Sequence, residues 1–504
     1  MAIIVANHPN VLTTKINEVE TLGYKSFRAK VEEQIASGNR LLSFFGSPIQ
    51  GPAKQGVTTP KNVALNAVFL ATGRGLIHFR GIAEAAEEYK PLTNKFSFMH
   101  CFEREIHDQY GLPMTGHPWL KPIRFEGQQL GKMNDYRFYK LEGKEVHEVA
   151  VGPVHAGVIE PGHFRFMCHG EKVYHLEIHL GYQHRGAEAL LTKTEPRKIS
   201  PLIESIAGDT AVAYTVAFCR GWEALCGISV SPEVECIRGI ALELERVAMH
   251  LVGLGGLATD VAFLPGSSTY GRLRTSVINL SMRLCGSRFG RSWFRPGQLR
   301  FAFTEKHKAD IRKTIDQVQK DIALINRLFR QSTTVRHRLC TTGTVPTELA
   351  KSIGIVGMTG RASGVACDTR GELKGGVYAA HPIEVVTEPD GDCWSRGLIR
   401  IREIDLSLDW ILKIVNSLSE VSENERVEYS PLPNACVVSV EEGWRGEVVQ
   451  YIETDSSGKI AHFKVQDPSI RNWFGLAQAV KDNAIYDFPI CNKSFDLSYC
   501  GNDL

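Results

Sequence analysis

The sequence predicts an α+β protein in which a small N-terminal α/β domain precedes a larger, mainly α-helical domain with peripheral β-strands. Three observations support this fold class. With 504 residues, the chain is too long for one ordinary hydrophobic core. Strand-like and helical patterns alternate over the first hundred residues, whereas residues 204–260 and 306–329 show long helical periodicity. A polar stretch with several glycines favours a linker, so we predict domains at 1–124 and 149–504, joined by residues 125–148.

The composition narrows the classes of function. A net charge of +2 gives no basis for a nucleic-acid partner. No apolar run approaches the roughly 20 residues that span a bilayer, and the N-terminus lacks the pattern of a secretory signal. The 12 cysteines include no Cys-x-x-Cys pair, which structural zinc and iron–sulfur sites generally need. We therefore expect a cytoplasmic chain that holds no metal cluster of its own.

The N-terminal region predicts a helix around residues 18–36 and strands at 63–70 and 75–79. A short acidic helix follows within residues 102–119, and the Gly and Pro at 111 and 113 end it. Considered alone, an acidic helix of this kind is usually solvated.

Residues 204–260 predict two consecutive helices, which we expect at the centre of the large domain. Apolar residues recur every three or four positions over 232–257, typical of a helix with one face in the core. The same segment carries a dense set of charges, including Glu243 and Arg246. These charges either form a solvated outer face or serve the function of the protein. The first helix begins with small residues, which allow another helix or a ligand to approach its backbone.

Several motifs resemble known families. Within residues 102–119, the pattern Glu-Arg-Glu-x-x-Asp-x-Tyr-Gly followed by Gly-His-Pro resembles the thirty-kilodalton subunit of respiratory complex I. Gly-Pro-x-His at 152–155, Arg-Pro-Gly at 295–297 and Arg-Gly-Glu at 445–447 resemble the large subunit of group 4 membrane-bound NiFe hydrogenases and the related quinone-site subunit of complex I. Their order in one chain resembles the formate hydrogenlyase and hydrogenase-4 type. The resemblance implies a hydrogenase-large-subunit-like fold for the second domain.

The chain departs from the hydrogenases at the metal site. In that family, two Cys-x-x-Cys pairs hold the nickel–iron centre, because soft thiolates suit these metals. The four corresponding positions here carry other residues: Ala207, Thr210, Ser498 and Gly501. We therefore predict that the chain binds no nickel.

The resemblance to complex I implies a quinone as a candidate acceptor, since proton donors beside an electron source suit quinone reduction. It assigns candidate catalytic roles to His155, His163, Asp260 and Tyr214. Tyr214 is a chemically similar group near the tyrosine position of the family, which is Gly208 here. Candidate coupling residues, which would transmit conformational or electrostatic changes, are Glu223, Glu243, Arg246 and Arg361.

These observations predict a subunit of a membrane-bound, ion-translocating, complex-I-like oxidoreductase, peripheral on the cytoplasmic face of the membrane. Its expected partners are a small iron–sulfur subunit with a 4Fe–4S cluster and membrane subunits that move ions. Residues 253–256 lack a preceding strand and so form no dinucleotide fingerprint, which places any NAD binding of this NADH-dehydrogenase-like complex in another subunit. Two alternatives stay open. The chain is a coupling scaffold that has lost its redox site, or it is a hydrogenase with an atypical metal site.

Overall fold

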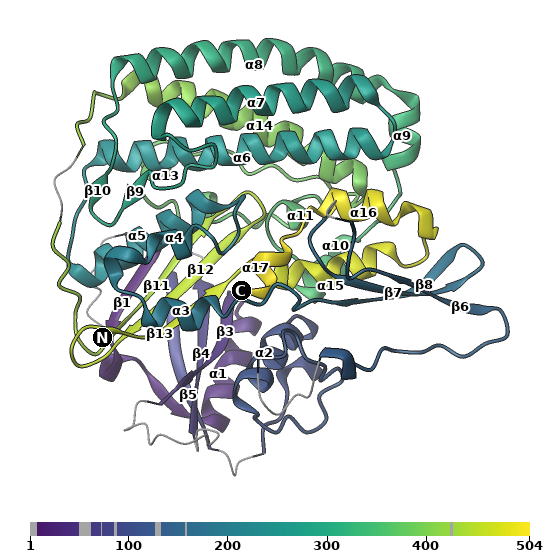
Figure 1. Cartoon of the computed structure of the whole chain (residues 1–504). Helices are drawn as coiled ribbons and strands as arrows, with labels where there is room; N and C mark the ends of the chain where they lie inside the picture. The colour runs from purple at the N-terminus through teal and green to yellow at the C-terminus, as the bar shows by residue number, and fades with distance from the viewer. Residues whose placement is uncertain are drawn as a thin grey trace.

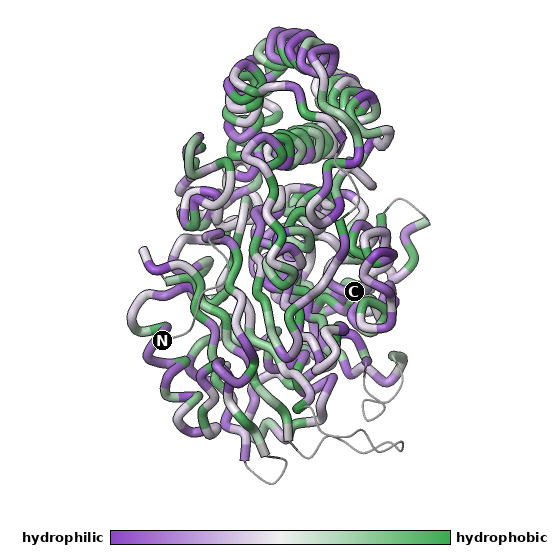
Figure 2. The backbone as a smooth tube through the Cα atoms, turned by 90° about the vertical axis from the view of Figure 1, so that its left-hand side faces the viewer, coloured by the Kyte–Doolittle hydropathy of each residue, from purple (hydrophilic) through white to green (hydrophobic). Residues whose placement is uncertain are grey.

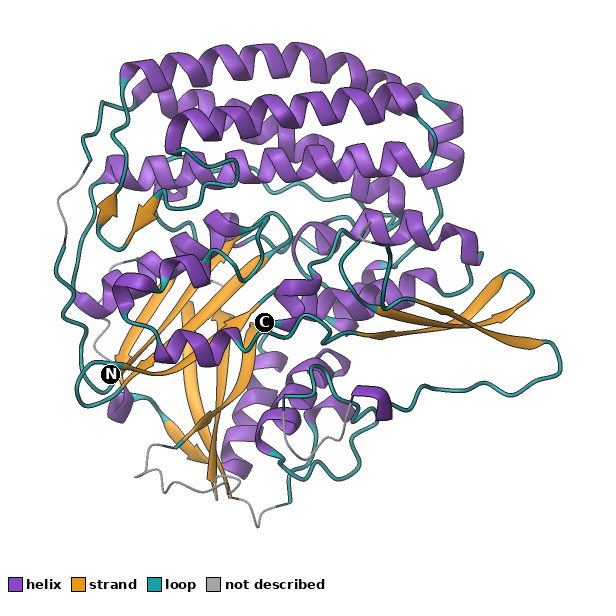
Figure 3. Ribbon diagram, viewed as in Figure 1, coloured by secondary structure: helices purple, strands orange, loops and turns teal. Residues whose placement is uncertain are grey.

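The structure is a computed structural model, and it describes residues 8–49, 62–71, 73–84, 88–126, 133–156, 159–423 and 427–504. Three layers follow one another from bottom to top in Figure 1: an N-terminal α/β unit, a second sheet flanked by short helices, and a stack of long helices. Both helices and strands contribute substantially (Figure 3), so the predicted α+β class is confirmed.

The N-terminal unit is a four-stranded sheet in the order β2-β5-β4-β3, with two helices. The bounds are β2 (Thr21–Gly23), α1 (Tyr24–Ala36), β3 (Arg40–Pro48), β4 (Asn62–Ala71), β5 (Gly75–Glu84) and α2 (His100–Tyr110). The α1 helix packs Phe27 against the sheet, where Gly81 of β5 leaves room for its ring. The left-handed conformation of Gly111 ends α2, as the sequence predicts.

The central sheet joins the two ends of the chain. Its strand order is β1-β11-β12-β13, all antiparallel, so the N-terminal strand β1 pairs with β11, more than 400 residues away. The bounds are β1 (Val11–Lys15), β11 (Ala435–Glu442), β12 (Glu447–Thr454) and β13 (Ile460–Gln466). All eight residues of β11 and of β12 are buried, since the sheet is covered on both faces.

The helical layer contains the predicted central pair and a bundle, although residues 204–210, predicted as the start of the first helix, form turns. The α5 helix (Ala211–Cys226) lies on the central sheet, where Gly221 allows close contact with Ser439 of β11. The bundle helices are α6 (Pro232–Asp260), α7 (Leu264–Cys285), α8 (Glu305–Gln331) and α14 (Cys393–Ser417). The outermost, α8, alternates hydrophilic and hydrophobic segments at the top of Figure 2, and its predicted apolar residues are buried.

Shorter elements complete the large domain. A three-stranded arm, β6 (Val146–Val151), β7 (His163–His169) and β8 (Lys172–His179), projects from one side. Four further helices lie around the candidate site or the charge clusters: α3 (Ala187–Lys193), α15 (Ser469–Val480), α16 (Phe488–Phe495) and α17 (Tyr499–Asp503). Others are α4 (Ser200–Ile203), α9 (Thr333–Leu339), α10 (Thr347–Ile353), α11 (Gly357–Arg361), α12 (Thr369–Glu372), α13 (Val377–Ala380), β9 (Phe294–Arg295) and β10 (Gln298–Leu299). Within the described residues, none of the helices combines the length and apolar character that crossing a bilayer requires.

An ionic cluster holds the N-terminal unit to the large domain. Glu105 of α2 pairs with Arg124, and Lys464 of β13 donates to Glu105 at 2.7 Å. Lys464 also pairs with Glu188 of α3 at 2.9 Å. These side chains are almost fully buried, except Glu188, whose side chain is 15% exposed. The acidic residues of α2 therefore face the interior rather than solvent, which corrects the interpretation from the acidic pattern alone.

Candidate active site

The positions aligned with the four nickel–iron ligands come together between α5 and α17. Ala207 and Thr210 lie just before α5, while Ser498 and Gly501 bound the first turn of α17. Ser498 accepts a hydrogen bond at 2.9 Å from the backbone N–H of Gly501 and so caps that turn. A side chain at Gly501 would meet Oδ2 of Asp467 at 2.3 Å. The space around the four ligand positions is thus occupied by side chains other than cysteine, among them Asp467.

A tyrosine–carboxylate pair occupies this place. The hydroxyl of Tyr214 donates to Oδ2 of Asp467 at 2.5 Å, and both residues are buried. The other oxygen of Asp467 accepts from the backbone N–H of Ser469 at 2.7 Å. Burial and the neighbouring carboxylate raise the pKa of Tyr214 well above its ordinary value, so the hydroxyl keeps its proton at neutral pH.

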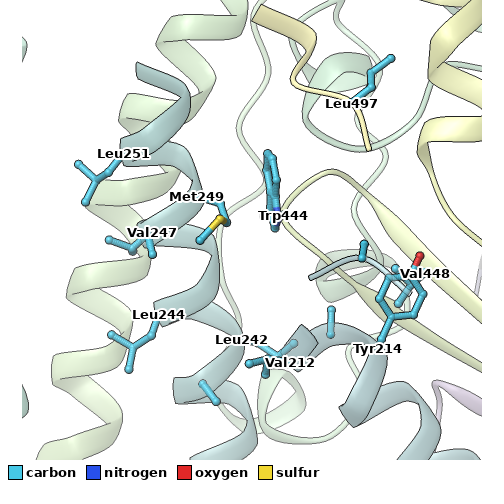
Figure 4. Packing of buried hydrophobic residues seen from close by; sticks show 14 of the residues in the cluster. Val212, Tyr214, Leu242, Leu244, Val247, Met249, Leu251, Trp444, Val448 and Leu497 are labelled. Carbon is cyan, nitrogen blue, oxygen red and sulfur yellow. The ribbon is translucent and has the colours of Figure 1, made fainter. Parts of the chain in front are cut away.

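An arginine–carboxylate pair lies beside it. Arg445 donates to both oxygens of Asp209, at 2.8 and 2.7 Å, and also to Thr210 at 3.2 Å. Its guanidinium stacks over the ring of Trp444, 3.9 Å from the centroid. In Figure 4 Trp444 stands between α6 and the C-terminal segment, opposite Met249, while Tyr214 lies near Val448. The Asp209 side chain is 38% exposed, so the site opens to the surface on that side.

The residues present do not fit a nickel–iron centre. The four ligand positions supply one hydroxyl each from Thr210 and Ser498 and no thiolate. Cys500 is the nearest thiol, and burial raises its pKa to about 11, which disfavours a metal-binding thiolate. Across the described ranges, no group of three or more His, Cys, Asp or Glu side chains is arranged to hold a metal ion.

The other predicted catalytic residues, His155, His163 and Asp260, form no hydrogen bonds with one another among the described residues, and no hydrogen bond joins them to the Tyr214–Asp467 pair. His155 bonds the backbone oxygen of Gly162 at 2.8 Å, and His163 bonds that of Gly152 at 3.1 Å. Gly162 packs directly on the ring of Tyr499, next to Ser498. Burial lowers the pKa of His163, which favours its neutral form.

Asp260 lies at the C-terminal end of α6, on the side facing α16. Its pKa is raised by burial, and the nearby Lys493 opposes the shift. One of its carboxylate oxygens, Oδ2, is buried without a hydrogen-bond partner among the described residues. The carboxyl therefore holds a proton more readily than a solvated aspartate.

Three of the four predicted coupling residues belong to one buried charge network. Glu243 accepts from Arg246 at 3.2 Å, Arg370 at 3.0 Å and the Tyr378 hydroxyl at 2.6 Å. Arg361 binds Glu403 at 2.8 Å and Glu442 at 2.9 Å. The sets join through Arg246, which lies 3.8 Å from Glu403. The members, all at most 3% exposed, are Glu243, Arg246, His250, Arg361, Asp368, Arg370, Glu403 and Glu442.

This network sets the protonation of its members. Burial opposes ionisation of Glu243, but Arg370 and Arg246 outweigh it and lower the pKa. Burial and the neighbouring Asp368 instead raise the pKa of Glu442 to about 7. The charged face of α6 is therefore interior, and the expectation of a solvated outer face is wrong. The periodicity of the sequence does not distinguish a solvated charged face from a buried one, because it does not show whether a charged residue has a partner of opposite charge.

The network reaches the candidate site through one loop. Arg246 donates to the backbone oxygens of Glu442 and Gly443, at 2.9 and 3.1 Å. The next residues of that loop are Trp444 and Arg445, which bind Asp209. A change at Asp209 is therefore mechanically connected to the buried charges.

Glu223 belongs to a second buried cluster. It binds Arg238 and accepts from the backbone N–H of Gly297 at 2.6 Å. Arg238 also binds Glu235, which is shared with Arg220. Glu223 thus supports the Arg-Pro-Gly segment rather than the network of Arg361.

Sequence reasoning missed Asp467, Asp209 and Arg445 as members of the site. Arg445 lies in the Arg-Gly-Glu motif and Asp209 adjoins a former ligand position, so both carried a signal. Asp467 carried none, because only the fold brings β13 and its following turn to α5.

The chain is similar to several known proteins. Residues 260–434 match the family described as the 49 Kd subunit of respiratory-chain NADH dehydrogenase. Formate hydrogenlyase subunit 5 of Escherichia coli is 27% identical over 82% of this chain and 77% of its own length. A polypeptide of the NADH-quinone oxidoreductase of Bacteroides thetaiotaomicron is 26% identical over 73% of this chain and 76% of its own length.

A solved structure shares the fold. A chain of the membrane-bound sulfane sulfur reductase, an archaeal respiratory membrane complex, superposes with a TM-score of 0.67 at 21% identity. The match covers 73% of this chain and all of that one. The resemblance predicted from the sequence is therefore confirmed: the chain is similar to subunits of membrane-bound, complex-I-like hydrogenases and oxidoreductases, and residues 260–434 match the family of the 49 kDa subunit of respiratory-chain NADH dehydrogenase.

Proposed function

We propose that the chain is a nickel-free electron-transfer subunit, which passes electrons from a partner's 4Fe–4S cluster to a quinone-type acceptor. The observation that carries the proposal is that the four thiolate positions hold no cysteine, while two hydrogen-bonded pairs, Tyr214–Asp467 and Asp209–Arg445, lie beside them. Soft metal ligands are replaced by groups that donate protons and stabilise negative charge.

Those groups match the needs of quinone reduction. A quinone takes up two electrons and two protons, and negative charge develops on its carbonyl oxygens as the electrons arrive. The Tyr214 hydroxyl and the Arg445 guanidinium are fixed donors in a largely buried place, where hydrogen bonds to a developing oxyanion are strong. The raised pKa of Tyr214 keeps its hydroxyl protonated at neutral pH, so that the group acts as a hydrogen-bond donor.

Asp260 and the two histidines extend the proposed site. Asp260 has a raised pKa and a carboxylate oxygen free of hydrogen bonds among the described residues, and so suits the delivery of a second proton. His155 and His163 fix the loop that packs on Tyr499 beside Ser498. In this proposal, the small iron–sulfur subunit approaches the exposed side of Asp209, and ion-translocating membrane subunits hold the assembly on the cytoplasmic face.

The second candidate function is a coupling scaffold without redox chemistry. The observation in its favour is the buried network, which links Glu243 and Arg361 to the loop of Arg445 through Arg246. In that case, movement of the loop would change the charge balance within the bundle without any acceptor binding.

Reduction of a short-chain quinone by the purified complex tests the proposal. We expect Asp260→Asn and His155→Ala to lower the rate at least tenfold, with inhibitor binding weakened in parallel. Unchanged rates of quinone reduction in both variants would contradict the proposed quinone site. Loss of ion transport with an Arg361 variant, in a complex that reduces no quinone, supports the scaffold. Hydrogen uptake by the complex would instead support an atypical hydrogenase.

A further inference from the structure

Cys393 and Cys491 form a buried pair of thiols between two helices. Cys393 is the first residue of α14, Cys491 lies on α16, and both are fully buried. A Cβ at Gly343 would lie 2.7 Å from the sulfur of Cys491 and 3.3 Å from that of Cys393. The two sulfurs are therefore no farther apart than the sum of these distances.

The surroundings stabilise a thiolate at Cys393. Nη2 of Arg396 donates to its sulfur at 3.4 Å. The N-terminal end of α14, a helix of 25 residues, adds its positive dipole end. The capping residue Asp392 is not a competing partner for Arg396, because its oxygens accept from backbone N–H groups of Thr341 and Ser395.

Arg396 gives a second, independent indication. It is fully buried, and within the described part of the chain it forms no ion pair with a carboxylate. Its other donors bind the backbone oxygens of Gly391 and Gly343 at 2.8 Å. A buried guanidinium needs a counter-charge, and the Cys393 sulfur is the ionisable group that it faces.

The two thiols differ in acidity. Burial opposes ionisation of Cys393, but the hydrogen bond from Cys491 and the charge of Arg396 lower its pKa to about 6. The pKa of Cys491 is raised well above its ordinary value, first by its hydrogen bond to Cys393 and then by burial. Such a pair combines a nucleophilic thiolate with a protonated partner thiol.

We propose that Cys393 and Cys491 are a redox-active dithiol site, which small peroxides convert into a disulfide between α14 and α16. The Cys393 thiolate attacks one oxygen of hydrogen peroxide, the O–O bond breaks, and Cys393 becomes a sulfenic acid while the other oxygen leaves as hydroxide and takes up a proton to form water. The Cys491 sulfur then attacks the Cys393 sulfur and displaces its hydroxyl, which leaves as water with the Cys491 proton. Two thiols are oxidised and one peroxide is reduced to two waters.

The disulfide would join two elements that reach the candidate active site. The α14 helix carries Glu403 of the charge network. The segment after α16 begins with Asp496, whose backbone oxygen accepts from Arg445 at 2.5 Å. The dithiol site itself stands independently of the proposed quinone chemistry, because it rests on other residues.

Peptide mapping of the full-length chain in its complex tests the site. After treatment with hydrogen peroxide and alkylation of the remaining thiols during unfolding, we expect a peptide linked through Cys393 and Cys491, which dithiothreitol removes. This measurement uses the unaltered chain, so misfolding of a variant does not enter. Absence of the linked peptide, with both thiols alkylated, would overturn the proposal.

Variants separate the two roles. In Cys491→Ser, Cys393 should stop at the sulfenic acid and be captured by dimedone present during unfolding. In Cys393→Ser, neither a crosslink nor a dimedone adduct on Cys491 should form. The matched control is Cys219, which is also fully buried but whose pKa burial raises. Oxidation of Cys219 as fast as Cys393 would show that acidity and pairing do not direct the reaction, and would contradict the proposal.

Discussion

Arg445 holds Asp209 with two parallel hydrogen bonds of 2.8 and 2.7 Å, directly beside the position of a missing metal ligand at Thr210. Bidentate pairs of this kind are strong and geometrically specific. The pair fixes the loop that Arg246 holds from its other side. Arg445 and Arg246, on the two sides of this loop, therefore connect the partly exposed carboxylate of Asp209 to the buried charges of α6, α11 and α14.

Replacing Tyr214 by Phe removes the hydroxyl that bonds Asp467 and leaves the ring in place. We expect quinone reduction to fall at least tenfold, because a fixed donor to the acceptor is lost. Stability should fall by about 1–3 kcal/mol, since Asp467 loses a hydrogen bond in a buried place. Steady-state rates and urea unfolding of the same preparation measure both effects. A normal rate with the expected loss of stability would show that the tyrosine is structural only.

Arg361→Met tests the charge network. Removing one partner of a buried ionic set leaves Glu403 and Glu442 without their cation, which should cost about 3–5 kcal/mol of unfolding free energy. The matched control is Lys351→Met, whose pair with Glu348 is exposed and should contribute at most about 1 kcal/mol. Equal losses in the two variants, measured by urea denaturation, would contradict the buried network.

The pH dependence of stability tests Glu245, which accepts from the N–H groups of Val212 and Ala213 at the start of α5. Burial raises its pKa from 4.5 to about 8. The folded chain therefore binds this proton more tightly than the unfolded chain. Its stabilising effect is complete below the unfolded pKa and is lost as pH rises through the folded pKa, by up to about 1.4 kcal/mol per pH unit.

Glu245→Gln removes this titration. Its unfolding free energy should fall less steeply than that of the parent between about pH 5 and pH 8. Glu348→Gln, at a side chain that is 87% exposed, should keep the parent slope. Parallel curves for the parent and Glu245→Gln would mean that the carboxyl is ionised throughout this range.

Lys464→Met tests the clasp between the N-terminal unit and the large domain. The variant leaves Glu105 and Glu188 without their shared cation, so α2 and β13 should exchange amide hydrogens faster. Lys95→Met removes an exposed pair with Glu32 in the N-terminal unit and should change exchange only locally. Hydrogen exchange with mass spectrometry distinguishes these outcomes, and unaltered protection of α2 in Lys464→Met would count against the clasp.

Much of the architecture follows from the sequence. The helices at 232–260 and 305–331 and the strands at 62–71 and 75–84 appear where periodicity predicts them. At the start of α6, the Ser231 hydroxyl accepts from the backbone N–H of Val234 and caps the helix. Local signals suffice for such elements because each depends on residues a few positions apart.

Contacts between residues far apart in the sequence could not be predicted from such local patterns. The pairing of Val11 with Ser439 and the bond from Tyr214 to Asp467 join residues hundreds of positions apart, and no local pattern marks them. The charges of α6 show the same limit, because only the packing of α12, α13 and α14, which supply Arg370, Tyr378 and Ser407, makes Glu243 a buried and paired residue. The resemblance to the hydrogenases located the four metal-ligand positions in the sequence, but it did not predict that Tyr214 and Asp467 would pair beside them.

The most direct test of the nickel-free quinone site is single-turnover quinone reduction by the chemically reduced complex, with nickel quantified in the same sample. The account predicts reduction of a short-chain quinone with far less than one nickel per chain, and loss of that reaction in Tyr214→Phe. Nickel near one per chain, or a quinone reaction that Tyr214→Phe leaves unchanged, would contradict it.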